Sequence, residues 1–244
     1  MSQNAAPLNR ALSKLGVLSR SQATVAIRAG RVSVNGRVVR DPLASVVPER
    51  ARIELDGHTA ARQAWRTILL HKPRGVMTTR RDPQRRPTIY DVLGEAGRGL
   101  VAVGRLDLAT SGLIVLTTDT QLANWIADPA NAVPRVYVVT VRGRVEQAEM
   151  ERLLDGIGEG RDWLRAAAIT LRKASSRESH LTVELREGRN REVRRLFAAV
   201  GHEVTRLKRV RLGGLDLGTT KPGEWRKLPA AEIALAFPDA PVRV

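Results

Sequence analysis

A short polar segment between two apolar runs is the first stretch of this chain that could do chemistry. Residues 104–112 read GRLDLATSG, and apolar residues stand before them at 100–103 and after them at 113–116. Short apolar runs next to glycine and small polar residues predict buried strands. Asp107 and Arg105 therefore lie in a loop at the edge of a predicted sheet, where functional groups are often held. A second interpretation, in which Asp107 only stabilises the turn, stays open from this segment alone.

A second segment rich in functional groups, EGRNREVRR, covers residues 187–195. It predicts a helix over residues 190–200 with Asn190 as its N-cap. Arg191, Arg194 and Arg195 would share one side of that helix by their i, i+3 and i+4 spacing. Residues 186–211 carry nine Lys/Arg against three Asp/Glu. One of these arginines could reach inward and pair with a carboxylate at the edge of the sheet.

The elements that must hold these segments follow from the apolar pattern. Strands and helices alternate without a regular strand–helix–strand order, which favours an α+β fold with a mixed, mainly antiparallel sheet. Strands are predicted at residues 67–71, 135–142, 181–185, 204–212, 215–217 and 224–228, and helices at 121–127 and 146–154.

The first quarter of the chain has a different organisation. Two short helices, residues 8–15 and 22–29, precede an Asn35-Gly36 pair between β-branched runs, which is a strong hairpin signal. A further strand is predicted at residues 53–55. Residues 1–66 contain 11 Lys+Arg and 4 Asp+Glu, a net charge of +7.

The whole chain is strongly basic, with 41 Lys+Arg against 25 Asp+Glu and a pI near 11.4. Such a balance favours a polyanionic partner, above all nucleic acid, although a generally basic proteome would give it too. Aromatic residues make up 3%, which argues against RNA modules that stack several bases on exposed rings. The loop of residues 78–87 contains Arg80, Arg81, Arg85 and Arg86. It is either a flexible surface loop or a phosphate clamp.

Several classes of protein are disfavoured by composition. The chain has no cysteine, and its four histidines are far apart, so we expect no disulfide, thiol chemistry, metal site or cofactor. No apolar run approaches the roughly 20 residues of a membrane span, and no apolar signal core stands at the N-terminus. We therefore expect a cytoplasmic monomer without a membrane partner.

Residues 8–39, LNRALSKLGVLSRSQATVAIRAGRVSVNGRVV, resemble the small S4-like RNA-binding module. The motifs HKPRGV, GRLDLATSGLIVLTTD, RVYVV and EGRNREVRRLFAAVGHEVTRLKRVRLG resemble those of bacterial ribosomal-RNA pseudouridine synthases of the RsuA/RluB family. This similarity runs from residue 8 to about 228. It implies a flexible tail over residues 1–7, an S4-like domain over 8–56, a linker over 57–66 and a pseudouridine synthase domain over 67–244.

The resemblance also implies roles for single residues. Asp107 matches the catalytic aspartate, Arg194 the arginine that pairs with it, and Tyr137 the tyrosine that lines the target base. Arg105 matches the arginine beside the aspartate, and Lys72 with Pro73 matches a structural motif. RNA contacts are expected from further basic or polar residues: Arg10, Arg20, Arg28, Arg31, Arg80, Arg81, Arg189, Asn190 and Arg191. The chain departs from the family at Glu192, Thr120 and Arg135, where Gln, Gly and Lys are more usual.

The chemistry suits these residue types. Pseudouridine formation cleaves the N-glycosidic bond, turns the uracil and joins its C5 to the sugar. Positive charge develops on the sugar, and a carboxylate can meet it covalently or remove the 2′ proton. Either route needs Asp107 ionised, which burial opposes and a neighbouring Arg194 would favour. The target uridine must also leave its stack to reach such a carboxylate.

Two other functions remain as alternatives. A non-catalytic RNA-binding or ribosome-assembly factor on the same fold would show the same basic surfaces but would not depend on Asp107. Another RNA-modifying enzyme, such as a methyltransferase, should show a glycine-rich cofactor loop after a strand, and none is visible in the sequence.

Overall fold

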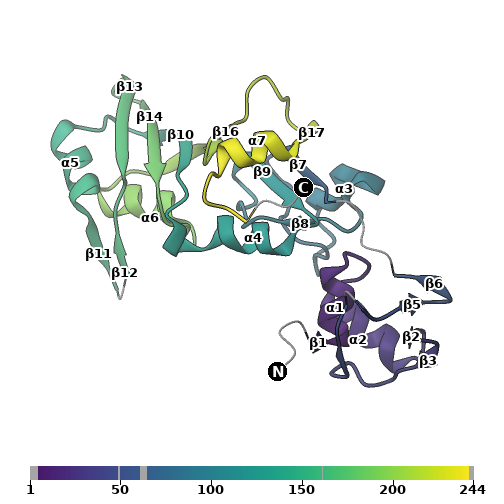
Figure 1. Cartoon of the computed structure of the whole chain (residues 1–244). Coiled ribbons are helices and arrows are strands. Elements are labelled where there is room, and N and C mark those ends of the chain that lie inside the picture. The colour runs from purple at the N-terminus through teal and green to yellow at the C-terminus, as the bar shows by residue number, and fades with distance from the viewer. Residues whose placement is uncertain (1–4, 49, 61–64, 161, 242–244) are drawn as a thin grey trace. The chain divides into compact units, whose positions relative to one another are not determined.

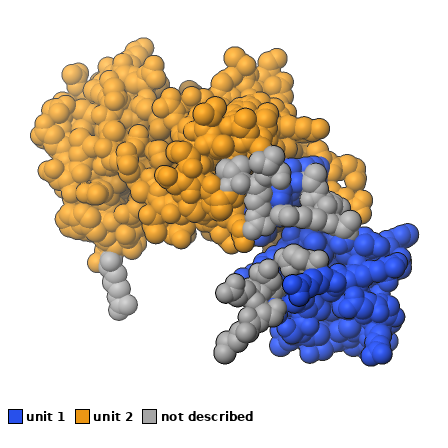
Figure 2. Space-filling model, viewed as in Figure 1, with its two compact units in different colours: residues 1–66, 118–120 blue, residues 67–117, 121–244 orange. Residues whose placement is uncertain are grey.

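The computed structural model describes residues 5–48, 50–60, 65–160 and 162–241 (Figure 1). The chain divides into two compact units, which Figure 2 colours separately. Unit 1 contains residues 1–66 and 118–120, and unit 2 contains residues 67–117 and 121–244.

Unit 1 is built on a helical pair. Helices α1 (Leu8–Lys14) and α2 (Arg20–Arg28) bury Leu8, Leu12 and Ile27 in one apolar cluster. Ser19 begins α2 with a capping box, because its hydroxyl accepts from the Gln22 N–H while the Gln22 side chain accepts from the Ser19 N–H.

A small four-stranded sheet of order β3-β2-β5-β6 completes unit 1. Asn35-Gly36 joins β2 (Val32–Val34) to β3 (Arg37–Val38), with φ of 51° and 81°. Asp56-Gly57 joins β5 (Ile53–Leu55) to β6 (His58–Thr59) with φ of 53° and 78°. Two consecutive positive φ angles are what a tight hairpin turn requires.

Two boundaries of the predicted division need correction. Residues 1–4 of the expected tail lie outside the described residues, but Ala6–Pro7 form strand β1 and pair with β4 (Ser45–Val46), which buries Ala6. The expected linker contains β6, because the Asp56-Gly57 turn folds His58–Thr59 back onto β5; residues 61–64 lie outside the described ranges.

Unit 2 is a mixed, mainly antiparallel sheet, as the sequence predicts. Of the strand pairs in the described sheet, β15 and β9 run parallel and the others antiparallel. The strand order is β13 (Ala168–Ala174), β14 (Glu178–Leu185), β10 (Arg135–Arg142), β15 (Val204–Leu212), β9 (Ser111–Thr117), β7 (Thr67–Lys72), β17 (Trp225–Lys227), with β16 (Leu215–Asp216) on β15 and β8 (Val101–Ala102) on β9.

Both faces of this sheet are covered. Strand β9 sends Leu113 and Val115 into one apolar cluster and Ile114 and Leu116 into another. Helices α4 (Thr120–Ala127) and α7 (Ala230–Ala236) pack on the first face (Figure 1). The second face is covered by α3 (Ile89–Leu93), α5 (Gln147–Asp155) and α6 (Glu192–Ala199). Short 3-10 turns cover Gly94–Gly97 and Pro129–Asn131.

Several elements of the fold differ from the sequence-based expectation, and one helix starts later than predicted. The hairpin of β11 (Ile157–Glu159) and β12 (Asp162–Leu164) was not predicted, nor were β13, α3 and α7. Helix α6 begins at Glu192, and its N-cap is Arg191 with φ of 51°, not Asn190. The Glu192 carboxylate accepts from the Arg189 N–H at 3.1 Å and so closes the turn that precedes the helix. No helix in the described ranges is both long and apolar enough to cross a membrane.

Candidate active site

A cavity of about 300 Å³ opens in unit 2 where the loop before β9 meets β10, β15 and the start of α6. It brings together most of the predicted catalytic residues and several polar residues that were not predicted. The residues lining it that matter for its chemistry are Arg105, Asp107, Thr110, Arg135, Tyr137, Arg189, Asn190, Arg191, Glu192 and Arg209.

The loop that carries Asp107 is held by its backbone. The Asp107 carbonyl accepts from the Thr110 N–H at 3.0 Å. Thr78 donates its hydroxyl to the Leu106 carbonyl at 2.8 Å. Lys72, a fully buried side chain at the end of β7, donates from Nζ to the carbonyls of Asp107 and Thr110 at 3.1 and 2.8 Å. Hydrogen bonds from two neighbouring segments, those of Lys72 and Thr78, therefore fix this loop.

The buried environment of Lys72 is unfavourable for the charge of its ammonium group. Its third donor contact reaches the Pro73 carbonyl at 3.0 Å, and carbonyl oxygens only partly replace water. Burial lowers the pKa of Lys72 to about 8, while the charge of Asp107 acts in the opposite direction. All three contacts of Lys72 go to backbone carbonyls, and the structural role that the resemblance implies stays a prediction.

The cation nearest the Asp107 carboxylate is Arg191, not Arg194. The Arg191 Nη1 lies 3.6 Å from Asp107 Oδ2, and 34% of the Asp107 side chain is exposed. Arg194 instead donates to the Val204 carbonyl at 2.7 Å and to the Ala109 carbonyl at 3.5 Å. The predicted ion pair differs because the left-handed backbone at Arg191 directs that residue to the cavity mouth, while the first turn of α6 points Arg194 at backbone oxygens. Burial lowers the pKa of Arg194, with Arg191 acting in the same direction and Asp107 against it.

Tyr137 lies where the sheet is irregular. Its strand, β10, shows a register shift against β15 between Val136 and Tyr137. Tyr137 is opposite Arg209 on β15, and Arg209 in turn is opposite Gly112 on β9. Tyr137 and Arg209 both line the cavity, and 9% and 3% of these residues are exposed. Tyr137 and Asp107 thus line the same cavity.

Three buried charged residues that the sequence analysis did not assign to the site form its inner wall. Arg209 donates from Nε to the Leu113 carbonyl at 2.7 Å, and its Nη2 has no partner among the described residues. Glu192 Oε1 is also without a partner there, and burial raises the pKa of Glu192. Arg135 donates to the carbonyls of Val133, Ile126 and Arg186, and burial lowers its pKa. The sequence signal for Arg209 was an arginine within the apolar pattern of a buried strand. The same segment, RLKRVRL, is equally typical of an exposed basic strand, so this signal did not identify a buried arginine.

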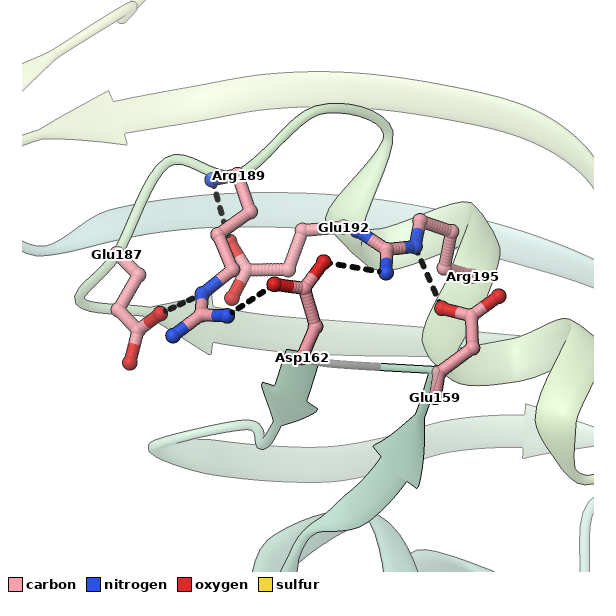
Figure 3. A network of polar contacts seen from close by, with 6 residues as sticks. All are labelled: Glu159, Asp162, Glu187, Arg189, Glu192 and Arg195. Carbon is pink, nitrogen blue, oxygen red and sulfur yellow. Dashed lines mark hydrogen bonds and ion pairs between the residues drawn. The ribbon is translucent and has the colours of Figure 1, made fainter.

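A network of ion pairs fixes the segment before α6 to the β11–β12 hairpin (Figure 3). Asp162 lies between Arg189 and Arg195, at 2.8 and 2.7 Å, and Arg195 also contacts Glu159 at 2.5 Å. Arg189 pairs with Glu187 as well. The hydrogen bond with Arg195 and the nearby arginines lower the pKa of Asp162. Arg189 was predicted to contact RNA, and here its guanidinium is engaged by two carboxylates.

The other predicted RNA contacts are dispersed. Arg105 and Asn190 are exposed at the cavity, and Arg81 is exposed in its loop. Arg80 donates to the Leu100 carbonyl and lies 4.5 Å from the centre of the Tyr90 ring, so it holds its loop. In unit 1, Arg10, Arg20 and Arg28 are exposed, whereas Arg31 pairs with Asp56. Among the described residues there is no group of three or more His, Cys, Asp or Glu side chains that could hold a metal ion.

Comparison with known proteins supplies the family. A sequence profile described as RNA pseudouridylate synthase matches residues 66–199, and an S4 domain profile matches residues 7–43. The chain belongs to this synthase family. An uncharacterized RNA pseudouridine synthase of Aquifex aeolicus is 38% identical over 94% of this chain and 93% of its own length. Ribosomal large subunit pseudouridine synthase B of Escherichia coli is 38% identical over 92% of this chain and 80% of its own.

A solved structure agrees with the sequence comparison. A crystal structure of a pseudouridylate synthase superposes with a TM-score of 0.67 at 29% identity, covering 95% of this chain and 99% of the other. The predicted resemblance, the fold class and the enzyme class are thereby confirmed. This pseudouridine synthase is an isomerase with an S4 domain in front of its synthase domain.

Proposed function

We propose that this synthase converts a specific uridine of ribosomal RNA to pseudouridine, with Asp107 acting on the ribose of a uridine that has left its stack. The observation that carries the proposal is the half-buried Asp107 carboxylate in a cavity that also contains Tyr137 and has Arg191 at 3.6 Å. The cavity volume of about 300 Å³ suits a single nucleoside rather than a duplex.

Asp107 acts on the anomeric centre of the sugar. As the C1′–N1 bond breaks, positive charge develops on the ribose, and the carboxylate either bonds to C1′ or takes the 2′ proton. Arg191 places a positive charge 3.6 Å from the carboxylate and helps to hold its orientation. Arg194 has a positioning role, since it fixes the Ala109 carbonyl two residues after Asp107. Tyr137 packs against the base and keeps the ring in the cavity while it turns.

The names of the relatives and the charge of the chain support ribosomal RNA as the partner. The E. coli relative is named for the large ribosomal subunit, so large-subunit RNA is the first substrate to test. The net charge of +16 favours binding to RNA phosphates. Unit 1, which contains the S4 domain, supplies exposed arginines for this binding.

The test is a pseudouridine map of ribosomal RNA from cells with and without this gene, complemented by wild type and by Asp107→Asn. We expect one or a few uridines to lose modification without the gene and to regain it only with wild type. Purified Asp107→Asn should still bind the RNA, because it keeps every basic residue. Restored modification by Asp107→Asn would contradict the role of the carboxylate, and an unchanged map would contradict the ribosomal target.

A further inference from the structure

The inner wall of the cavity contains polar atoms that the mechanism above does not use. Arg209 Nη2 and Glu192 Oε1 are both buried, both without a partner among the described residues, and both belong to residues that line the cavity. An unpartnered donor at a buried guanidinium is costly, since it has lost water without gaining another acceptor. Because both residues line the cavity, a polar ligand bound there would give these atoms their missing partners after a small movement of the side chains.

Arg209 Nη2 is a donor, so its partner on the ligand must be an acceptor, and the reaction itself creates a strong one. When C1′–N1 breaks, its electron pair leaves with N1, and the uracil anion spreads that charge over O2 and O4. The C5–C1′ bond then forms, C5 loses its proton, and N1 gains one. Nothing is oxidised or reduced, and no co-reactant is needed. The charge of the departing base therefore lies on carbonyl oxygens.

Resting on the proposed function, we propose that Arg209 is a further catalytic residue, whose Nη2 donates to a carbonyl oxygen of uracil and stabilises the base as it leaves. A charge-assisted hydrogen bond from a buried donor such as Arg209 strengthens as negative charge grows on the acceptor. Arg209 is held for this task by its Nε bond to the Leu113 carbonyl and by its strand pairing with Gly112 and Tyr137.

The symmetry of uracil makes one donor sufficient throughout the reaction. Turning the ring by half a turn about its C6–N3 axis exchanges N1 with C5 and O2 with O4, and N3–H stays in place. A donor that meets one carbonyl oxygen before the turn therefore meets the other after it. Arg209 can hold the base in both orientations without moving.

The second buried arginine of the wall provides a matched control. Arg135 is 6% exposed and also lines the cavity, but its guanidinium donates to the carbonyls of Val133, Ile126 and Arg186. Removing it costs backbone contacts and a buried charge without removing an unpartnered donor. Arg135→Met and Arg209→Met thus separate structural loss from loss of a contact to the base.

The experiment measures single-turnover cleavage of the glycosidic bond at saturating enzyme, with target RNA that contains uridine or 5-fluorouridine. Fluorine withdraws electrons and makes the uracil anion a better leaving group. Because it replaces the C5 hydrogen, cleavage is followed as loss of the intact nucleoside after nuclease digestion. We expect Arg209→Met to slow cleavage of uridine by about 10²–10³-fold. The slowing on 5-fluorouridine should be at least about tenfold smaller.

Arg135→Met should slow both RNAs by the same factor. Equal factors for Arg209→Met on the two RNAs, or no slowing at all, would overturn the role of Arg209. If Arg209→Met does not fold, Arg209→Lys, which keeps the charge, takes its place. This variant must also slow cleavage less on 5-fluorouridine RNA than on uridine RNA. A wild type that forms no pseudouridine would instead refute the proposed function, so the two failures are distinguishable.

Discussion

The Lys72 ammonium donates a hydrogen bond to the backbone carbonyl of Asp107 at 3.1 Å, although the Lys72 side chain is fully buried. A buried positive charge thus lies beside the loop that carries the candidate catalytic carboxylate. Three carbonyl oxygens accept from the Lys72 ammonium, and no carboxylate of the described residues lies within 4 Å of it. The loop gains a defined shape at the cost of a buried cation.

The first prediction concerns the stability that this lysine provides. Lys72→Met leaves the Asp107 and Thr110 carbonyls without their donor, so we expect a loss of about 1–3 kcal/mol in the free energy of unfolding at pH 7. Pseudouridine formation should fall as well, because the loop loses its support. Urea unfolding and single-turnover rates measure the two effects. A fully stable and active variant would show that the buried ammonium has no such role.

The pH dependence of Lys72 gives a second prediction. Its pKa is about 8 in the folded protein and near 10.5 when unfolded, so between these pH values the unfolded chain binds more protons. Stability must then rise with pH in wild type relative to Lys72→Met, by at most about 3 kcal/mol at about 1.4 kcal/mol per pKa unit. Unfolding of both proteins at pH 7, 9 and 10 tests this, and parallel curves would contradict it.

Gly112 makes a third, purely steric prediction. Its φ is 111°, and a Cβ there would lie 2.1 Å from the Arg209 carbonyl oxygen across the parallel pair of β9 and β15. Gly112→Ala should therefore cost about 3 kcal/mol or more and disturb Arg209 together with the cavity. Gly218→Ala is the control, because Gly218 has φ of 58° and open space around its Cβ site. The control should cost about 1–2 kcal/mol, and equal unfolding free energies for the two variants would refute the clash.

The two arginines near Asp107 should differ in what they affect. Arg191 is exposed and lies 3.6 Å from the carboxylate, so Arg191→Gln should lower the rate with little change in stability. Arg194→Gln removes donors to the Val204 and Ala109 carbonyls, and we expect a loss of about 1–3 kcal/mol along with the lower rate. Thermal unfolding and single-turnover rates on the same preparations separate the two. Reversed effects would restore Arg194 as the direct partner of Asp107.

Unit 1 gives a prediction about salt. Neutralising the exposed Arg10, Arg20 and Arg28 with glutamine should weaken RNA binding and reduce the slope of log K against log salt by about 2–3, if each meets one phosphate. Arg31→Gln should reduce the slope by less than any one of these, because Arg31 already donates to Asp56 at 2.8 Å. Filter binding at several salt concentrations measures the slopes. Unchanged slopes for the triple variant would place the RNA contacts elsewhere.

Local signals in the sequence were sufficient for much of this protein. The Asn35-Gly36 turn, the helix after Ser19 and the strand at residues 135–142 depend on residues close in the chain, and the structure contains all three. The motifs around Asp107 and Arg194 identified the family for the same reason, since each is a continuous run. Asp56-Gly57 was an equally local signal that the sequence analysis overlooked.

What the tertiary structure decided is which charged side chains share one cavity. Asp107 faces Arg191 rather than Arg194 because a left-handed residue before α6 turns the chain, and Arg209 is buried because β15 pairs with β9. Glu192 is buried at the start of α6. The sequence sets the type and order of the charged groups. Their burial and their partners depend on the pairing of strands that are far apart in the chain, and a local sequence pattern does not predict that pairing.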